Sequence, residues 1–66
     1  MLTLKPLWGY LAYNRITLKE LARRSGLSYQ ALVFIKRDNT MSKDSLDKIC
    51  TCLNLRIDQV MRYDED

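Results

Sequence analysis

Few side chains in this 66-residue sequence could carry catalytic or metal chemistry. Cys50 and Cys52 are the only cysteines, and there is no histidine. Two residues apart on a helix, these thiols point about 200° away from each other, so they cannot form a disulfide without breaking the helix. A zinc site would need further nitrogen or sulfur ligands. Because a phosphate-binding glycine loop and an acidic pair across a cleft are also missing, we expect no enzyme activity, cofactor or metal.

Positive charge is the other chemistry that the sequence offers. The chain has 11 lysines and arginines against eight acidic residues, for a net charge of +3. Three of the acids are the last three residues, 64–66, so the rest of the chain carries a net charge of +6. A body this basic suits a polyanionic partner. On charge alone, a surface of ordinary solvated lysines is an equal alternative.

No long apolar segment is present. The N-terminus lacks the charged region and apolar stretch of a signal peptide. The longest apolar run is far below the roughly 18 residues that span a bilayer. With two unbridged cysteines, the composition favours a reduced, cytoplasmic protein without a membrane partner.

Short helices must position these charges. The length indicates a single domain, residues 1–66, and a hydrophobic content of 47% is typical of a globular chain. Apolar residues recur at helical spacing in five segments. We therefore expect an all-α fold with helices at about 6–13, 18–25, 29–36, 43–53 and 57–61. In the fourth helix, Cys50 is expected as a small core residue and Cys52 as a more exposed thiol.

Polar residues mark the ends of these helices. Thr17 and Glu20 form a capping box, in which each side chain accepts a hydrogen bond from the backbone N–H of the other residue. Ser28 and Ser42 are expected to cap the third and fourth helices. Asn54 can end the fourth helix in the left-handed conformation.

Residues 17–37 have the spacing of two short helices that cross steeply at a tight turn. Ala22 is small where the helices cross, Gly26 follows in the turn, and Leu32 packs back onto the first helix of the pair. Three further apolar residues fill the seam: Leu21, Leu27 and Ile35. This order is typical of a helix-turn-helix. Its second helix, at about 28–37, presents an outer face that fits the major groove of DNA, about 12 Å wide.

The motif resembles the helix-turn-helix of the Cro and lambda-repressor family, also called the XRE family. The segments Leu4-Lys5-Pro6-Leu7-Trp8, Lys48-Ile49-Cys50 and Asp58-Gln59-Val60-Met61 look like its compact single-domain members. The resemblance implies a five-helix lambda-repressor-like domain of bacterial or phage type, nucleoid-associated when bound, with short terminal strands at a dimer contact.

The chain departs from the family pattern at two places. Many members have a glycine after the second helix of the motif, where this chain has Asp38-Asn39. Asn39 can adopt the same positive φ, so the turn is retained. Val33 and Phe34 are apolar at positions that are often polar or basic in the family.

Carried over by position, the resemblance places the start of the third helix in the major groove. Gln30 can bond adenine N6 and N7, and Tyr29 can meet a phosphate or a thymine methyl. Val33 and Phe34 would touch thymine methyls, or Phe34 would pack on the fourth helix or a dimer partner. Ser28 would both cap the helix and contact a phosphate. The alternative for Tyr29 and Gln30 is an ordinary surface role.

Four cations are expected to reach phosphates that flank the groove. They are Lys19 on the second helix, Lys36 and Arg37 at the end of the third, and Lys43 at the start of the fourth. Such contacts position a protein on DNA without reading its sequence. For Lys36 and Arg37, the alternative role is compensation of the helix dipole.

Together these residues predict a sequence-specific regulator of transcription that binds double-stranded DNA, most simply as a repressor and a homodimer. A dimer doubles the few base contacts, on half-sites about 34 Å apart. Its surface is expected in the C-terminal region, from Ile57 to Tyr63, with residues 1–4 as a strand. Because the chain offers no separate sensor domain, we expect no small-molecule ligand.

A protein-interaction module, such as an antitoxin or antirepressor, is the alternative. Exposed apolar side chains would serve as its anchors. The candidates are Trp8, Tyr13, Val33 and Phe34. Trp8 also fits the role of a filler at the core or its edge.

Overall fold

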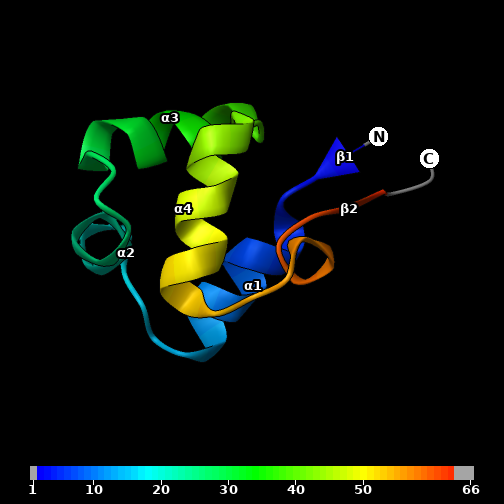
Figure 1. Ribbon diagram of the computed structural model, residues 1–66, viewed down its shortest axis with the longest axis horizontal. Coiled ribbons are helices and arrows are strands. Elements are labelled where there is room, and N and C mark those ends of the chain that lie inside the picture. The colour runs from blue at the N-terminus through cyan, green and yellow to red at the C-terminus, as the bar shows by residue number, and fades with distance from the viewer. Residues whose placement is uncertain (1, 64–66) are drawn as a thin grey trace.

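The computed structural model describes residues 2–63 and has helices as its main elements (Figure 1). The elements in chain order are β1 (Leu2–Thr3), α1 (Lys5–Tyr13), α2 (Leu18–Ser25), α3 (Tyr29–Asp38), α4 (Lys43–Leu53), the 3-10 helix η1 (Ile57–Gln59) and β2 (Arg62–Tyr63). Met1, expected in a terminal strand, and the acidic residues 64–66 lie outside the described residues. No helix in the described part is long and apolar enough to cross a membrane.

The segment expected as a fifth α-helix is a single 3-10 turn. Its first residue follows Arg56, which provides no side-chain cap; instead the Arg56 N–H donates to Gln59 Oε1 at 2.9 Å. The N–H groups of Val60 and Met61 both donate to the Ile57 carbonyl, at 3.0 Å each. The first turn of a helix is unfavourable in free energy, and a short helix without a cap gains too few hydrogen bonds to offset it. The chain therefore leaves the helical conformation and enters β2.

Three helices begin at the serine or threonine cap that the sequence predicts. The cap hydroxyl accepts from the N–H three residues later, at 3.1 Å for Thr17 and Ser28 and 3.2 Å for Ser42. α1 has no side-chain cap and begins one residue before Pro6. A proline in the first turn costs no hydrogen bond, because that N–H has no partner within the helix. Helices α3 and α4 both end at an asparagine with a φ of 55°.

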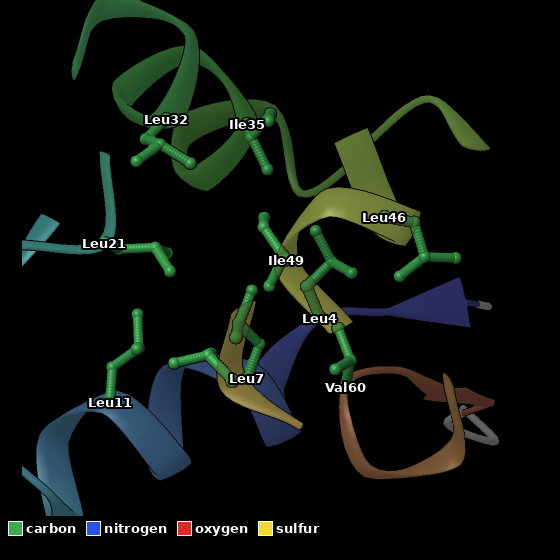
Figure 2. Packing of buried hydrophobic residues seen from close by; sticks show 10 residues of the cluster. Leu4, Leu7, Leu11, Leu21, Leu32, Ile35, Leu46, Ile49 and Val60 are labelled. Atoms are coloured by element: carbon green, nitrogen blue, oxygen red, sulfur yellow. The ribbon is translucent and has the colours of Figure 1, made fainter. Parts of the chain in front are cut away.

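The core lies where all the helices meet, and leucines dominate it. The buried side chains are Leu4, Leu7, Leu11, Leu21, Leu32, Ile35, Leu46, Ile49, Leu53 and Val60. Figure 2 shows Ile49 of α4 facing side chains from α1, α2 and α3. Each fully buried leucine or isoleucine contributes about 1.5–3 kcal/mol through the hydrophobic effect. This packing fixes α2 and α3 against α4 and leaves the outer side of α3 uncovered.

A two-stranded antiparallel sheet joins the two ends of the described chain. Leu2 is paired with Tyr63 and Thr3 with Arg62. The expected terminal strands are thus present, and they pair with each other within one chain. Figure 1 shows the sheet beside α1, on the side of the molecule away from α2.

The structure distinguishes the alternatives for Trp8 and corrects the expectation for Cys52. Trp8 is half-buried and packs against the core, which fits a filler at the edge of the core and not an exposed anchor. Cys52 was expected to be more exposed than Cys50, but both are half-buried, because both thiols pack against the core from α4. Of the four proposed anchors, Tyr13, Val33 and Phe34 remain exposed.

Candidate nucleic-acid interface

A sharp turn between α2 and α3 sets the direction of α3. Gly26 has a φ of 80°, in the left-handed region that glycine adopts without steric cost. Its N–H donates to the Ala22 carbonyl at 3.0 Å and closes α2. The Ser25 hydroxyl then accepts from the Leu27 N–H at 3.2 Å. The turn directs α3 across the end of the molecule, with Leu32 and Ile35 facing inward (Figure 2).

Glu20 departs from the expected capping box. Thr17 accepts from the Glu20 N–H as predicted, but the Glu20 carboxylate turns toward the C-terminal end of α2. There it accepts from Arg23, and from Arg24 Nε at 3.0 Å. The Arg23 hydrogen bond, followed by that of Arg24, lowers the pKa of Glu20, and the carboxylate in turn raises the pKa of Arg23. Two guanidinium partners compete better for the carboxylate than one backbone N–H.

The N-terminal end of α3 is capped and open to solvent. Ser28 is exposed while its hydroxyl accepts from the Ala31 N–H. Tyr29, 44% exposed, and the exposed Gln30 occupy the first two positions of the helix. The positive end of the helix dipole lies here. These three side chains are therefore available to an anionic or hydrogen-bonding partner.

One turn further along α3, the exposed surface becomes apolar. Val33 is 37% exposed and Phe34 is 52% exposed. Phe34 also lines a shallow groove between α3 and the start of α4, together with Ala31, Met41 and Ser45. The sequence left open whether Phe34 is exposed or packs beside the fourth helix. In the structure its ring is exposed and also lines a groove next to α4.

Lys36 and Arg37 lie beside aromatic rings at the C-terminal end of α3. Lys36 Nζ is 5.9 Å from the centroid of the Trp8 ring, and Arg37 Cζ is 5.0 Å from that of Phe34. Arg37 Nε also donates to Asp38 Oδ1 at 3.4 Å. Both cations are exposed.

The two other predicted cations lie on helices that adjoin α3. Lys19 is the second residue of α2 and Lys43 the first of α4, and both are exposed. Within residues 2–63, Lys19, Lys36 and Lys43 have no carboxylate within 4 Å, whereas Lys48 pairs with Asp44. A cation that is not paired with a carboxylate keeps its charge available to a phosphate.

Asn39 fastens the C-terminal end of α3, and sequence reasoning missed this role. Its Oδ1 accepts from the Leu4 N–H at 2.9 Å, and its Nδ2 donates to Thr3 Oγ1 at 3.2 Å. The sequence predicted the left-handed backbone of Asn39, which the φ of 55° confirms. No local signal indicated its bonds to Thr3 and Leu4, because they join residues that are far apart in the chain.

Burial disfavours the charged form of both thiols. Burial raises the pKa of Cys50, and the nearby Asp47 carboxylate raises it further. Burial also raises the pKa of Cys52, whose thiol donates to the Ile49 carbonyl at 3.3 Å. A raised pKa leaves less of the nucleophilic thiolate. Among the described residues, no group of three or more side chains could hold a metal ion.

The comparison with known families agrees with the geometry of α2 and α3. Residues 6–66 match the family model described as Cro/C1-type HTH DNA-binding domain. The chain belongs to this family. No curated protein and no solved structure matches it. The predicted resemblance to Cro and the lambda repressor is confirmed, and membership in the Cro/C1-type family supports a DNA-binding regulator.

Proposed function

We propose that this Cro/C1-type domain is a transcriptional repressor that reads a specific DNA sequence with α3 in the major groove. The observation that carries the proposal is the open N-terminal end of α3. There Ser28, Tyr29 and Gln30 are exposed together on a helix that its neighbours hold firmly. A major groove about 12 Å wide admits such a helix, and its first residues then meet the base edges.

Each predicted side chain has a role in this proposal. Gln30 bonds an adenine, while Tyr29, Val33 and Phe34 contact a thymine methyl or the backbone beside it. The remaining five residues contact phosphates and fix the position of the domain on the duplex: Lys19, Ser28, Lys36, Arg37 and Lys43.

Selection of bound duplexes from a random pool tests the proposal directly. The parent protein is expected to enrich one sequence, and Gln30→Ala is expected to lose the preference at one or two positions. The loss of a bidentate contact to adenine corresponds to about 1–3 kcal/mol of discrimination. If the variant enriches the same sequence as the parent, Gln30 is not a base reader. If the parent enriches nothing, sequence-specific reading is wrong.

The salt dependence of binding tests the phosphate contacts. Each phosphate that a cation neutralises contributes about 0.9 to the slope of log K against log salt. Lys43→Gln is expected to weaken binding to all duplexes alike and to reduce the slope by about that amount. Lys48→Gln is the matched control, because Lys48 is paired with Asp44 on the same helix. Equal effects of both substitutions would contradict a specific contact by Lys43.

We also propose that the repressor acts as a homodimer through its C-terminal region. Leu2 and Ile57 are 43% and 53% exposed, and Tyr63 is 79% exposed. Exposed apolar side chains of this kind can mark a surface that binds another protein. Sedimentation of the free protein, repeated for Tyr63→Ser, tests this. A parent protein that stays monomeric at tens of micromolar, with and without operator DNA, would contradict the dimer.

Protein recognition is the second candidate function, and the exposed aromatics favour it. Tyr13 is 88% exposed at the end of α1, and Phe34 lies beside an apolar groove. An antitoxin or antirepressor would use such anchors against a protein partner. The salt titration separates the two functions, because a pure protein that shows no salt-sensitive binding to duplex DNA would favour this candidate.

A further inference from the structure

The last two cations of α3 each lie over an aromatic ring. Lys36 Nζ lies 5.9 Å from the Trp8 ring centroid and Arg37 Cζ 5.0 Å from that of Phe34. Both distances fall within the roughly 6 Å at which a ring face attracts a cation. The two rings come from different elements: Trp8 from α1 and Phe34 from α3 itself. Two adjacent cations therefore each have an aromatic neighbour, one from α1 and one from α3.

Each cation keeps hydrogen-bond donors for a ligand while it is held. The Lys36 ammonium has three N–H groups, and contact with one ring face leaves others directed away from the ring. Arg37 has five N–H groups, and the one on Nε is bonded to Asp38 Oδ1. The Arg37 side chain is 68% exposed. Both cations thus lie beside a ring and remain open to solvent.

The Trp8 ring has a defined position, and this supports the contact with Lys36. Trp8 is half-buried and packs against the hydrophobic core, so its ring is held by the interior of the molecule. The same region is tied to α3 by the bond from the Leu4 N–H to Asn39 Oδ1. Trp8 and Lys36 consequently belong to one connected part of the structure.

We propose that Trp8 and Phe34 are positioning residues that hold Lys36 and Arg37 ready to bind DNA phosphates. This inference rests on the proposed function, since it assumes that α3 binds DNA. Long cationic side chains lose rotational freedom when they bind, and a side chain already restricted by a ring loses less. Phe34 then acts through Arg37 as well as through any base that it touches. Trp8 acquires a role that a leucine of similar apolar character could not fill.

The first experiment examines the contact in the free protein. Trp8 is the only tryptophan in the chain, so its fluorescence reports on its surroundings without interference. Lys36→Met is expected to change the intensity or wavelength of the emission, and Lys48→Met, on α4, is expected to leave it unchanged. Identical spectra for the parent and Lys36→Met would overturn the contact.

The second experiment is a double-mutant cycle on DNA affinity with Trp8→Leu, Lys36→Met and the double variant. Trp8→Leu is expected to weaken binding by about two- to five-fold, since an exposed cation–π contact has about this strength. Trp8→Phe, which restores an aromatic ring, is expected to recover most of the loss. In the Lys36→Met background, Trp8→Leu should have no further effect. A parallel cycle uses Phe34→Leu and Arg37→Met.

The outcomes separate this inference from the proposed function. Additive effects of Trp8→Leu and Lys36→Met, in a parent that binds DNA, would overturn the positioning role and leave DNA binding intact. A parent that binds no duplex DNA would refute both proposals. Thermal melting of each variant shows that it is folded at the assay temperature, and Trp8→Phe covers the case in which Trp8→Leu fails to fold.

Discussion

At its N-terminal end, α3 is capped by its own Ser28 and leaves Tyr29 and Gln30 exposed, whereas side chains from other elements fasten its C-terminal end. There Asn39 bonds to Thr3 and Leu4, and Lys36 lies over Trp8. In the function proposed above, the two ends of α3 have different tasks. The open end would meet bases, and the fastened end would give the helix a defined direction.

Removing the packing between the two ends should have the largest effect. Leu32 is fully buried in the middle of α3, so Leu32→Ala is expected to lower the free energy of unfolding by about 2–5 kcal/mol. Chemical denaturation measures this. The neighbouring Val33→Ala, at a partly exposed position, is the matched control and should cost less than about 1 kcal/mol. Similar losses for both would mean that α3 is not held by its inner face.

The attachment of the C-terminal end comes next in size. Asn39→Ala loses two hydrogen bonds and places a less suitable residue at a φ of 55°, so we expect a loss of about 2–4 kcal/mol. Asn39→Gly keeps the backbone conformation and loses only the bonds, for about 1–2 kcal/mol. An unchanged free energy of unfolding in Asn39→Gly would show that the bonds to Thr3 and Leu4 contribute nothing to stability.

The cap at the N-terminal end is worth less. Ser28→Ala is expected to reduce stability by about 1 kcal/mol, because the Ala31 N–H loses its partner. Ser28→Asp retains an acceptor and should keep the stability of the parent, while its negative charge weakens DNA binding. Thermal or chemical unfolding, together with binding to a fixed duplex, measures both. Equal losses of stability in the two variants would exclude the cap as the cause.

The smallest change in stability is expected for Gln30→Glu, which tests the exposed N-terminal end of α3 directly. Gln30→Glu adds a negative charge in the first turn of α3, where the helix dipole favours it by about 0.3–1 kcal/mol. The same charge repels phosphates, so stability should rise slightly while DNA affinity falls. Gln30→Ala supplies the uncharged reference for both measurements. If stability and DNA affinity both rise or both fall in Gln30→Glu, the exposed N-terminal end of α3 does not serve DNA binding at the expense of stability.

Local signals explain what the sequence could predict. The caps at Thr17, Ser28 and Ser42 and the left-handed residues Gly26 and Asn39 depend on side chains within four residues, so their types and spacing suffice. The inward positions of α3 and α4 follow from helical periodicity in the same way. The helix pair that carries the candidate interface was therefore predictable.

What could not be predicted depends on how distant elements pack. The contact of Lys36 with Trp8 and the bonds of Asn39 to Thr3 and Leu4 join segments that are far apart in the sequence, and helical periodicity says nothing about such contacts. The expected fifth helix is a single 3-10 turn, because Arg56 provides no side-chain cap and the chain pairs with β1 from Arg62 onward. The bonds of Glu20 could have been predicted in part. Arg23 and Arg24 follow it by three and four residues, a spacing at which helical side chains interact, so they compete with the Thr17 N–H for its carboxylate.

The pairing of Leu2 with Tyr63 has a kinetic consequence. The helix-turn-helix forms from segments that are close in sequence, whereas the sheet closes a loop of almost the whole chain and bears the corresponding entropy cost. We expect the strands to join late in folding and to separate first in the native state, which would also release the Leu4 amide from Asn39. Slow exchange of that amide with solvent deuterium would therefore report how long the C-terminal end of α3 stays bonded to the N-terminal segment.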